Sequence, residues 1–508
     1  MNFTITTPLY YVNDKPHLGS TYTTLASDSI ARFHRLMNNN VIFITGVDEH
    51  GQKIQRKANS MNIPPQEHCD IISKEYIELW KKWGISNDKF IRTTSEEHKK
   101  LVYEFYKRVS DNGDIRLGRQ KGWYCVGCEE FKDVDEDKDE PKCQIHNQNL
   151  EWRDEENLFF CLSNYQRKIE DLVNSEDFIQ PLSRRNEIVN FVKNGLKDFS
   201  ISRVNLDWGI PVPGHNQHTF YVWFDALLGY LSAISECGSN KIDLVTQSGW
   251  PASVHIIGKD ILRFHAVYWP AMLLSAKLPL PRNVFGHGFL TREGQKMGKS
   301  LGNVIDPEYF LDLYGQDAIR WYLLRDIEFG NDGDFQSKRF IDIVNNDLNN
   351  TIGNLLNRTI SMSSKWFNDK TPTCNPTNDI VLIDICSKSV ESYKKYFVSY
   401  KLKQSCEEII TLASYANNYL NENEPWKLIK DDSKNNKVSE IIYNVLEICR
   451  IIGFLLQPIT PNLSNKILSQ LSLKNNVNNW EDILKWGNLK TNTQLPEPKP
   501  VMNRIEYS

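Results

Sequence analysis

The first 51 residues restrict the possible folds most strongly, because they alternate between strand and helix patterns. Residues 2–12 (NFTITTPLYYV) are rich in β-branched and aromatic types and predict a buried strand. A turn with Pro16 and Gly19 follows, and apolar residues then recur at helical spacing. Residues 40–51 (NVIFITGVDEHG) predict a second strand that ends in an acidic turn. Strand, helix and strand indicate a parallel βαβ unit, which binds ligands at the carboxyl ends of its strands.

Later stretches repeat this pattern after an interruption that carries cysteines and an acidic run. From Thr219 the strand and helix patterns resume, and from about residue 341 the chain is helical and rich in Asn and Lys. We therefore predict an α/β fold, with a Rossmann-type parallel-sheet catalytic domain that is split by an insertion and followed by an α-helical bundle. The predicted boundaries are 1–112 and 219–285 for the two halves of the catalytic domain, 113–218 for the insertion, 286–340 for a loop-containing connection and 341–508 for the bundle.

Composition narrows the class of protein further. The formal net charge is −4 and the pI is near 6.3, so any contact with nucleic acid must depend on local basic patches. No apolar run is long enough to cross a bilayer, and no Lys or Arg precedes Lys15, which argues against a signal or transit peptide. We expect a soluble cytoplasmic protein whose ten cysteines are reduced, metal-bound or buried.

Two short motifs in the insertion predict a metal site. Cys125 and Cys128 form a C-x2-C pair, and Cys143 and His146 form a C-x2-H pair. Three thiolates and one imidazole complete a closed tetrahedral zinc site, which leaves no position for a reactive water. We therefore predict one structural zinc ion per chain. The acidic run between the pairs (DVDEDKDE) lacks the central glycine and the closing glutamate of a calcium loop, so we interpret it as a solvated loop.

Two further motifs indicate polyphosphate chemistry when they are taken together. The stretch KMGKS, residues 296–300, places two lysines on a loop flanked by Gly294 and Gly302, which suits a mobile clamp. The turn PHLGS, residues 16–20, lies between a predicted strand and a predicted helix, and helix N-termini bind phosphate. His17 would add a donor for developing phosphate charge. Each motif alone is more often an ordinary surface turn, so only their combination is specific.

Motifs in this order resemble the class I aminoacyl-tRNA synthetases and, within that class, the methionyl-tRNA synthetase family. The resemblance runs nearly end to end and rests on TTPLYYVNDKPHLG, FITGVDEHG, the C-x2-C/C-x2-H insertion, YVWFDALLGY, IIGKDILRFH, GHGFLTREGQKMGKSLGNVIDP and GNLLNR. The pattern is similar to the subgroup with a single zinc knuckle and no extra C-terminal RNA-binding domain. The resemblance implies a methionine–tRNA ligase, which makes methionyl-adenylate and pyrophosphate from methionine and ATP. It then passes methionine to the 3′ end of tRNA(Met) for translation initiation and elongation.

The resemblance also implies roles for individual residues, with Mg²⁺ accompanying ATP. The implied catalytic residues are His17, Lys296 and Lys299. The implied ATP contacts are His17, Gly19, Ser20, Asp260, Lys296 and Lys299. The implied methionine contacts are Leu9, Tyr11, Asp48, Trp223, Ala226, Tyr230, Ile261 and His265, with Arg203 and Trp269 in the surrounding shell. Segment 286–340 would contact the tRNA stem, and 341–508 would read the anticodon through Asn354, Arg358 and Trp426.

The residue types fit these roles. An aromatic and aliphatic box suits a polarizable thioether, and Asp48 at a strand end suits an ammonium group. Displacement at the α-phosphate needs positioning and charge stabilisation more than acid–base chemistry. Asn354 and Arg358, four residues apart, project together from an amphipathic helix, and Trp426 offers a stacking platform for a base. On spacing alone, the apolar pocket positions and Trp426 are equally compatible with ordinary core roles.

Two positions depart from the pattern of the family. Ser20 stands where the family usually has a second histidine, and Gly298 stands where it usually has serine. Ser20 still donates a hydrogen bond but carries no charge, and Gly298 loosens the loop. These departures bear on the rate of the reaction and leave its type unchanged.

Three alternatives remain open from the residues. A small-molecule nucleotidyltransferase shares the histidine turn and the α/β core, but it needs neither a zinc insertion nor a long helical region. Synthetases for leucine or valine carry a much larger insertion, and those for cysteine use an open zinc site. An inactive relative that only binds RNA would not need Lys296, Lys299, Asp48 and His17 together. We expect a monomer, because family members without the extra domain tend to be monomers.

Overall fold

The computed structural model describes residues 1–506 apart from 133, 136–138, 145–146, 205, 236–241, 298–302, 376–378 and 474–479, and the side chains at 296, 482 and 484 also lie outside the description. Contacts divide the chain into two compact units. The sheet unit comprises Asn2–Pro16 and Val41–His287, and the helical unit comprises Met1, His17–Asn40 and Gly288–Ser508. No helix in the described ranges has the length and apolar character needed to cross a membrane.

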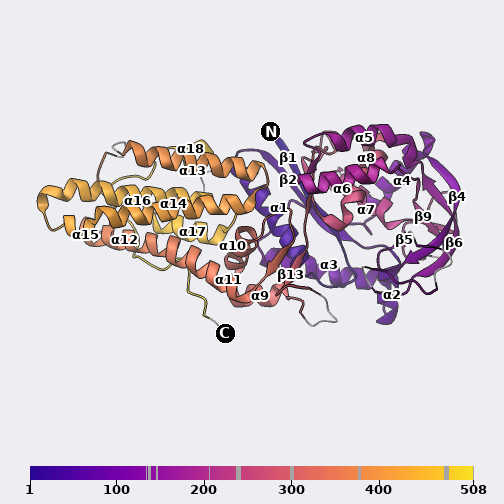
Figure 1. Ribbon diagram of the computed structural model, residues 1–508, viewed down its shortest axis with the longest axis horizontal. Coiled ribbons are helices and arrows are strands. Elements are labelled where there is room, and N and C mark those ends of the chain that lie inside the picture. The colour runs from indigo at the N-terminus through magenta and orange to yellow at the C-terminus, as the bar shows by residue number, and fades with distance from the viewer. Residues whose placement is uncertain are drawn as a thin grey trace. The chain divides into compact units, whose positions relative to one another are not determined.

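The sheet unit is built on six strands in the order β3-β2-β1-β11-β12-β7, of which β1 and β2 are labelled in Figure 1. They are β1 (Asn2–Tyr11), β2 (Asn40–Asp48), β3 (Lys89–Arg92), β7 (Ile179–Gln180), β11 (Val254–Gly258) and β12 (Val284–His287). The pairs β2/β3, β1/β11, β11/β12 and β12/β7 are parallel. Residues 3–7 are buried without alternation, as in a parallel sheet covered on both faces. The predicted Rossmann-type parallel sheet is confirmed.

In the described part of the sheet unit, α-helices accompany these strands. They are α2 (Gln52–Ser60), α3 (Pro65–Lys82), α4 (Glu96–Asp111), α5 (Gln166–Asn174), α6 (Leu182–Lys193), α7 (Val222–Ser232) and α8 (Trp269–Ser275). Helix α4 packs against α7 and α8. The ring of Phe105 on α4 lies 6.0 Å from that of Phe224 on α7 and 6.3 Å from that of Trp269, and all three side chains are fully buried. This packing fixes α7, whose other face carries predicted site residues.

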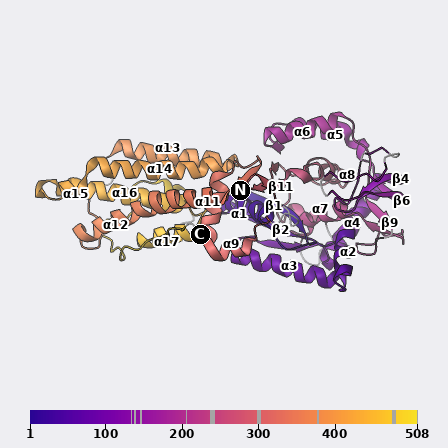
Figure 2. The same cartoon turned by 60° about the horizontal axis from the view of Figure 1, so that its bottom comes forward.

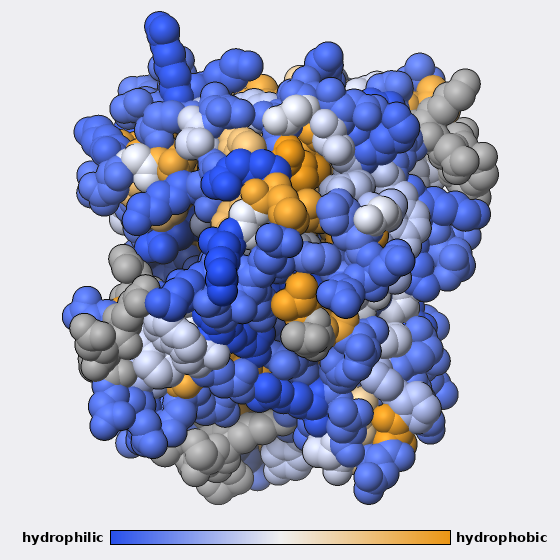
Figure 3. Space-filling model, turned by 90° about the vertical axis from the view of Figure 1, so that its right-hand side faces the viewer, coloured by the Kyte–Doolittle hydropathy of each residue, from blue (hydrophilic) through white to orange (hydrophobic). Residues whose placement is uncertain are grey.

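The insertion contains an antiparallel sheet in the order β5-β4-β6-β8. Its strands are β4 (Ile115–Cys125), β5 (Glu130–Lys132), β6 (Glu151–Phe160) and β8 (Phe199–Ser200), and β9 (Ser202–Val204) pairs separately with β10 (His218–Phe220). Strands β4 and β6 pair continuously from Ile115↔Phe160 to Tyr124↔Glu151. Figure 3 shows the face at this end of the molecule, which is mostly hydrophilic with small separate hydrophobic groups.

The predicted α-helical bundle is confirmed in the helical unit. Its helices are α9 (Pro307–Tyr314), α10 (Gln316–Asp326), α11 (Ser337–Val344), α12 (Asn354–Phe367), α13 (Ile380–Val398), α14 (Leu402–Asn423), α15 (Pro425–Leu428), α16 (Asn435–Leu455), α17 (Pro461–Gln470) and α18 (Trp480–Leu484). Helix α14 contacts both α13 and α16, and the three run side by side in Figures 1 and 2. From Ile441 to Leu455 every residue of α16 is buried, so this helix forms the centre of the bundle.

Helix α1 (Leu18–Leu36) joins β1 to β2 along the chain, yet it belongs to the helical unit by its contacts. Arg320 on α10 forms an ion pair with Asp28 on α1 (Nη2 to Oδ2, 2.8 Å), and both side chains are fully buried. Arg320 also donates from Nε to the carbonyl of Ile459 (2.6 Å). A buried charge is tolerated only when it is paired and hydrogen-bonded, so this network fixes α1 against α10.

Candidate active site

The turn after β1 is organised by His17, which caps the N-terminus of α1. Its Nδ1 accepts hydrogen bonds from the N–H groups of Gly19 (3.0 Å) and Ser20 (3.4 Å). The Oγ of Ser20 accepts from the N–H of His17 (3.1 Å), which completes a capping box. Because Nδ1 acts as an acceptor, a neutral His17 carries its proton on Nε2. That N–H is the donor that the imidazole can direct at an anion.

The structure of this turn explains why glycine stands at position 19 and serine at position 20. A Cβ on Gly19 would lie 2.9 Å from Cε1 of His17, so glycine makes room for the imidazole. Ser20 is buried, and its hydroxyl also donates to the carbonyl of His17 (2.7 Å). Two of the helix N–H groups expected to face phosphate are therefore bonded to the imidazole instead. The Nε2 proton of His17 is the donor of the imidazole that this capping arrangement leaves unused.

A hairpin precedes the lysine loop. Strand β13 (Leu290–Arg292) pairs with β14 (Gln295–Lys296), and Thr291 lies opposite Lys296. Asp334, in β15 (Gly333–Phe335), fixes the turn between the two strands. Its Oδ1 accepts from the N–H of Gly294 (2.8 Å) and from Oγ1 of Thr291 (2.6 Å). The loop that carries the lysines therefore starts from an ordered base.

The remaining residues predicted to bind ATP are described only in part. The backbone of Lys296 ends β14, but its side chain lies outside the description, as do Gly298 and Lys299 altogether. Asp260 is exposed in the single turn that follows β11. A Cβ on Gly258 would lie 2.5 Å from Oδ1 of Asp260, so glycine lets this carboxylate fold back over the end of the strand.

The residues predicted to surround the methionine side chain come together in the sheet unit. Trp223, Ala226 and Tyr230 share one face of α7 because they are spaced by three and four residues. The hydroxyl of Tyr230 lies 2.8 Å from Nε2 of His265, and the ring of Trp223 lies edge-on to that of His265 at 6.3 Å. Leu9, near the end of β1, packs on the same helix, since a Cβ on Gly229 would lie 2.4 Å from its Cδ1.

His265 is held as a neutral imidazole with a defined proton position. Its Nδ1 lies 3.1 Å from the carbonyl oxygen of Ile261, which can only accept, so Nδ1 carries the proton. Nε2 is then the acceptor for the hydroxyl of Tyr230. Burial lowers the pKa of His265 to about 4, so the pocket is uncharged at this end near neutral pH. His265 lies in a π-helical turn, Phe264–Tyr268, a distortion that is frequent at functional sites.

Asp48, at the end of β2, is the charged group of this region. It is 7% exposed, and its Oδ1 is buried with no hydrogen-bond partner among the described residues. Burial raises the pKa of Asp48 well above its ordinary value, and the negative charges of Asp225 and Glu129 raise it further. A buried carboxylate with one oxygen unbonded among the described residues, and with other carboxylates nearby, is costly without a cation. The geometry therefore suits an ammonium group.

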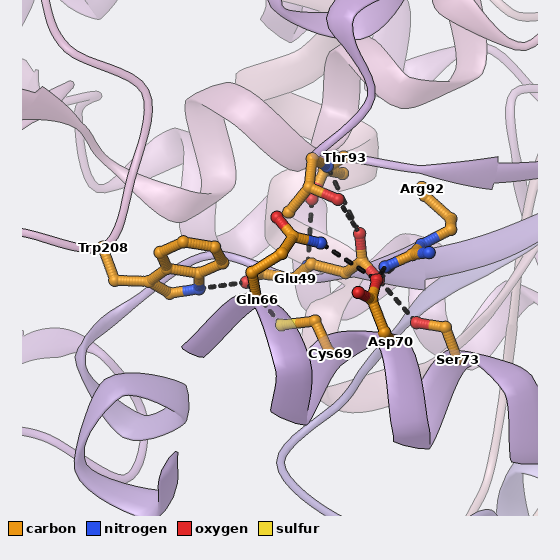
Figure 4. A network of polar contacts seen from close by, with 9 residues as sticks. Glu49, Gln66, Cys69, Asp70, Ser73, Arg92, Thr93 and Trp208 are labelled. Carbon is orange, nitrogen blue, oxygen red and sulfur yellow. Dashed lines mark hydrogen bonds and ion pairs between the residues drawn. The ribbon is translucent and has the colours of Figure 1, made fainter. Parts of the chain in front are cut away.

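Glu49, the residue after Asp48, fixes one side of the turn that carries Asp48 through hydrogen bonds (Figure 4). Glu49 is fully buried, and its carboxylate accepts hydrogen bonds from Ser73 Oγ (2.5 Å), Arg92 Nε (2.8 Å) and Thr94 Oγ1 (2.5 Å). Its carbonyl accepts from Nε1 of Trp208 (2.5 Å). These bonds join β2 to α3, to β3 and to the segment before β10, so the backbone that carries Asp48 is rigidly placed.

His50 clamps the same turn from the other side. Its Nδ1 lies 2.6 Å from Oδ2 of Asp225 on α7, and Nε2 of His98 lies 2.5 Å from the other oxygen. All three side chains are buried. Burial alone would raise the pKa of Asp225, but the two histidines lower it to about 2. Asp225 is therefore ionised at neutral pH, and it fixes α7 relative to the turn of Asp48.

The predicted zinc ligands converge as far as they are described. The sulfur atoms of Cys125, Cys128 and Cys143 all lie within 4.8 Å of one another, and those of Cys128 and Cys143 are 3.6 Å apart. The N–H of Cys128 also points at the sulfur of Cys125 (3.4 Å). Tetrahedral Zn–S bonds of about 2.3 Å separate their sulfur atoms by roughly 3.8 Å, so the cluster fits that metal. His146 lies outside the described residues.

The two residues assigned to the shell are both buried. Trp269 is fully buried, with its ring 5.7 Å from that of Trp250. Arg203 places its guanidinium 4.0 Å from the ring centroid of Tyr221 and donates from Nη1 to Ser200 Oγ (2.8 Å) and to a backbone carbonyl. Stacking on an aromatic face stabilises a buried guanidinium. Arg203 thus lies among the aromatic residues between the knuckle and the pocket.

The predicted anticodon residues also lie together, within the helical unit. The guanidinium of Arg358 lies over the ring of Trp426 at 5.9 Å and donates to Oδ1 of Asn421 (3.3 Å). Asn354 is exposed at the start of α12, and Leu348, Ile352, Leu355 and Leu356 are buried, as the helical stripe predicts. The preceding residues, Asn345–Gly353, form a π-helical segment that the sequence pattern did not indicate.

Comparison with known families decides among the alternatives. A family model described as tRNA synthetases class I (M) matches residues 3–135 and 132–360, and one described as the anticodon binding domain of methionyl tRNA ligase matches residues 372–506. The chain belongs to the methionyl-tRNA synthetase family. Its activity is that of a methionine–tRNA ligase, which confirms the resemblance identified from the motifs.

Sequence similarity to relatives extends over the whole length of this chain. A methionine–tRNA ligase from Nostoc sp. is 50% identical, and the match covers 100% of this chain and 98% of the relative. The chloroplastic and mitochondrial methionine–tRNA ligase of Arabidopsis thaliana is 48% identical over 100% of this chain and 83% of the relative. The solved structure of Mycobacterium tuberculosis methionyl-tRNA synthetase in complex with methionyl-adenylate is 36% identical, with a TM-score of 0.94 over 99% and 100% of the chains.

Three buried groups near the pocket were not predicted from the sequence. Glu49 and Asp225 stand inside the motifs FITGVDEHG and YVWFDALLGY without a predicted role of their own, and Glu129 follows the predicted metal ligand Cys128. A buried acid next to a functional residue is a signal in itself, because it must be hydrogen-bonded to be tolerated. The sequence does not reveal the hydrogen-bond partners of these acids, because the partners lie far away along the chain.

Proposed function

We propose that the pocket between β1, α7 and the turn after β11 binds the methionine side chain, and that Asp48 binds its ammonium group. The observation that carries this proposal is the buried Oδ1 of Asp48, which has no hydrogen-bond partner in the described part of the chain and lies close to a pocket whose histidine is neutral. The pocket residues proposed are Leu9, Tyr11, Trp223, Ala226, Tyr230, Ile261 and His265. ATP–pyrophosphate exchange with a panel of amino acids tests it. Methionine should support exchange, and replacement of Trp223 by alanine should weaken methionine binding more than ATP binding.

For the chemical step, we propose that His17, Lys296 and Lys299 stabilise charge on the phosphates of ATP. A methionine carboxylate oxygen attacks the α-phosphorus, the bond to the bridging oxygen breaks, and pyrophosphate leaves. The 3′-terminal hydroxyl of tRNA then attacks the carbonyl of the adenylate, and AMP leaves. We further propose that Gly19 and Ser20 border the phosphates, that Asp260 contacts the ribose and that Mg²⁺ accompanies ATP. Mg²⁺ neutralises phosphate charge in such reactions.

Replacement of Lys299 by alanine tests the proposed loop. Losing one contact that forms in the transition state costs roughly 100–1,000-fold in rate. We expect the activation rate to fall by that factor, while the dissociation constant of methionine stays within about twofold. Equal losses in rate and binding would instead indicate a general disturbance of the site and would contradict the assignment.

We propose that Cys125, Cys128, Cys143 and His146 hold one structural zinc ion. The clustered sulfur atoms support this proposal, and zinc supplies a fixed tetrahedral crosslink there. Metal analysis of the purified chain should give one zinc per chain, and the change Cys125→Ala should remove it and lower the melting temperature. A folded, metal-free chain that binds methionine normally would exclude a structural zinc.

We propose that Asn354, Arg358 and Trp426 read the tRNA anticodon. Arg358 and Trp426 present a guanidinium and a ring in contact, and exposed bases of single-stranded RNA are commonly stacked and hydrogen-bonded by such groups.

We also propose the domain boundaries 1–112, 113–218, 219–285, 286–340 and 341–508. We further propose that the protein is a cytoplasmic monomer. Light scattering on the purified chain tests the monomer.

A further inference from the structure

Glu129 occupies an unusual position directly after the metal-binding motif Cys125–Cys128. Its backbone has φ of 53°, in the left-handed region that glutamate rarely adopts. Its side chain is only 6% exposed, although no sequence motif calls for a buried acid here. A residue stays in a costly conformation with a buried carboxylate only when its surroundings hold it there.

One oxygen of this carboxylate joins two other segments of the sheet unit. Oε1 of Glu129 accepts from the hydroxyl of Tyr11 (2.7 Å), at the end of β1, and from the N–H of Lys53 (3.0 Å), in the first turn of α2. Gly51 precedes that helix and has no side chain with which to cap it. Glu129 therefore supplies the cap from another part of the chain, where the helix N-terminus favours a negative charge.

Packing around this oxygen is tight. Gly51 has φ of 116°, and a Cβ there would lie 2.4 Å from the hydroxyl of Tyr11 and 2.6 Å from both carboxylate oxygens of Glu129. Gly51 itself ends the turn that begins at Asp48, and its N–H donates to the carbonyl of Trp208 (3.1 Å). The carboxylate of Glu129 thus fits against the turn that carries the proposed ammonium ligand.

We propose that Glu129 is a positioning residue for methionine binding, which places Tyr11 and the turn of Asp48 according to the state of the cysteine knuckle. When Cys125 and Cys128 are held by a metal, residue 129 is kept in its left-handed conformation, and its carboxylate reaches Tyr11 and Lys53. Without that restraint the backbone relaxes toward negative φ and withdraws the carboxylate. This inference rests on the proposed assignment of the methionine pocket and goes beyond it.

A matched set of substitutions at and beside residue 129 tests the proposal, with the dissociation constant of methionine measured by calorimetry. Glu129→Gly suits the positive φ and removes the carboxylate, so we expect a folded chain that binds methionine about tenfold more weakly, as for loss of a hydrogen bond to a charged group. Glu129→Gln keeps Oε1 as the acceptor for both bonds and should stay within about threefold. Glu130→Gln is the control, because Glu130 pairs with Lys132 (2.7 Å) on β5.

A second arm uses a chelator and measures methionine binding and bound metal together. In the natural chain, metal removal should weaken methionine binding by about the same factor as Glu129→Gly does. In the Glu129→Gly variant, the same treatment should add less than about twofold, because the connection is already broken. Equal weakening in both chains, or weakening in neither, would overturn the proposal. The same holds if Glu129→Gly binds methionine as the natural chain does.

Tyr11→Phe separates this proposal from the pocket assignment. If Tyr11→Phe and Trp223→Ala both leave the methionine constant unchanged, the pocket is assigned wrongly, and the inference about Glu129 falls with it. If those variants weaken binding and Glu129→Gly does not, the pocket stands and Glu129 is only structural. If all three weaken binding, and Tyr11→Phe and Glu129→Gly together cost less than the product of the two, the hydrogen bond between them carries the effect.

Discussion

The proposed methionine pocket and the proposed anticodon face differ in how firmly their side chains are held. In the pocket, Glu49 and Asp225 are fully buried, and each accepts several hydrogen bonds that fix the turn of Asp48. On the anticodon face, Arg358 is half-buried, with a hydrogen bond to the exposed Asn421 and a ring contact to Trp426. The first region is therefore held by several buried hydrogen bonds, whereas the second has partly exposed side chains with fewer hydrogen bonds among the described residues.

This difference follows from the size of the ligands. A single amino acid offers few atoms, so discrimination depends on groups that are already desolvated and oriented. A tRNA loop offers bases that splay and adapt, and the many phosphate and base contacts of the whole molecule share the binding energy. Substitutions in the pocket should therefore have large effects that are specific for methionine, and substitutions on the anticodon face should have modest effects that are specific for tRNA.

The change Asp48→Asn tests the proposed methionine pocket most severely. It removes the charge that the ammonium needs, and truncating one partner of a buried charge pair costs several kcal/mol, so we expect kcat/KM for methionine to fall by about 1,000-fold. This value of kcat/KM is measured by ATP–pyrophosphate exchange at several methionine concentrations. The melting temperature should hold or rise, because the variant no longer buries an unpaired charge. A loss below about tenfold would mean that another group binds the ammonium.

The affinity for methionine should also depend on pH through Asp48. Burial, followed by the charges of Asp225 and Glu129, raises the pKa of Asp48. The carboxylate form binds the ammonium, so affinity is complete above that raised pKa and falls as pH decreases through it, by up to about tenfold per pH unit. The Asp48→Asn variant should show no such acid limb. An acid limb that survives in the variant would assign the titration to another group.

Trp426→Ala tests the proposed anticodon face. Stacking of a base on an aromatic ring contributes about 1–3 kcal/mol, so aminoacylation of tRNA should fall at least tenfold. ATP–pyrophosphate exchange, which needs no tRNA, should remain nearly unchanged. If exchange falls in parallel with aminoacylation, Trp426 is a packing residue, and the contrast between the two regions disappears.

Loss of one hydrogen bond to Glu49 should raise KM for methionine by a smaller factor. Thr94→Val keeps the shape of the side chain but removes the hydroxyl that donates to Glu49 (2.5 Å), and one such bond is worth about fivefold in KM for methionine. Thr94→Ser keeps the donor and should restore the natural value. Asp70→Asn provides a control, because the described hydrogen bonds of Asp70 come from Nη2 of Arg92 and from Gln66, and none joins it to Glu49 itself. An effect of Asp70→Asn as large as that of Thr94→Val would contradict a local clamp.

The smallest effect is expected for Asn421→Ala. This change frees the guanidinium of Arg358 from its exposed hydrogen bond (3.3 Å), and such surface bonds contribute little. We expect aminoacylation to change by less than about threefold in either direction. A loss as large as that of Trp426→Ala would show that the position of Arg358 must be fixed in advance, as in the methionine pocket.

The sequence by itself determined the elements and the kind of chemistry. The stretches predicted as strands at 2–12 and 40–51 contain β1 (Asn2–Tyr11) and β2 (Asn40–Asp48) of the parallel sheet, and the stripe at Leu348, Ile352, Leu355 and Leu356 is buried as its spacing requires. The two cysteine pairs and the motifs around His17 and Lys296 identified the family. These features are readable because strand alternation, helical periodicity and ligand spacing are set by residues that are close along the chain.

Tertiary structure alone decided the electrostatics of the site. Asp225 meets His50 across 175 positions and Glu129 meets Tyr11 across 118, and nothing local to these residues encodes either pairing. The imidazole of His17 differs, because it bonds helix N–H groups only two and three residues away, which the sequence pattern had assigned to phosphate. Charge, burial and proton position depend on what packs nearby in space, and that depends on the register of whole sheets and helices rather than on any short segment of the chain.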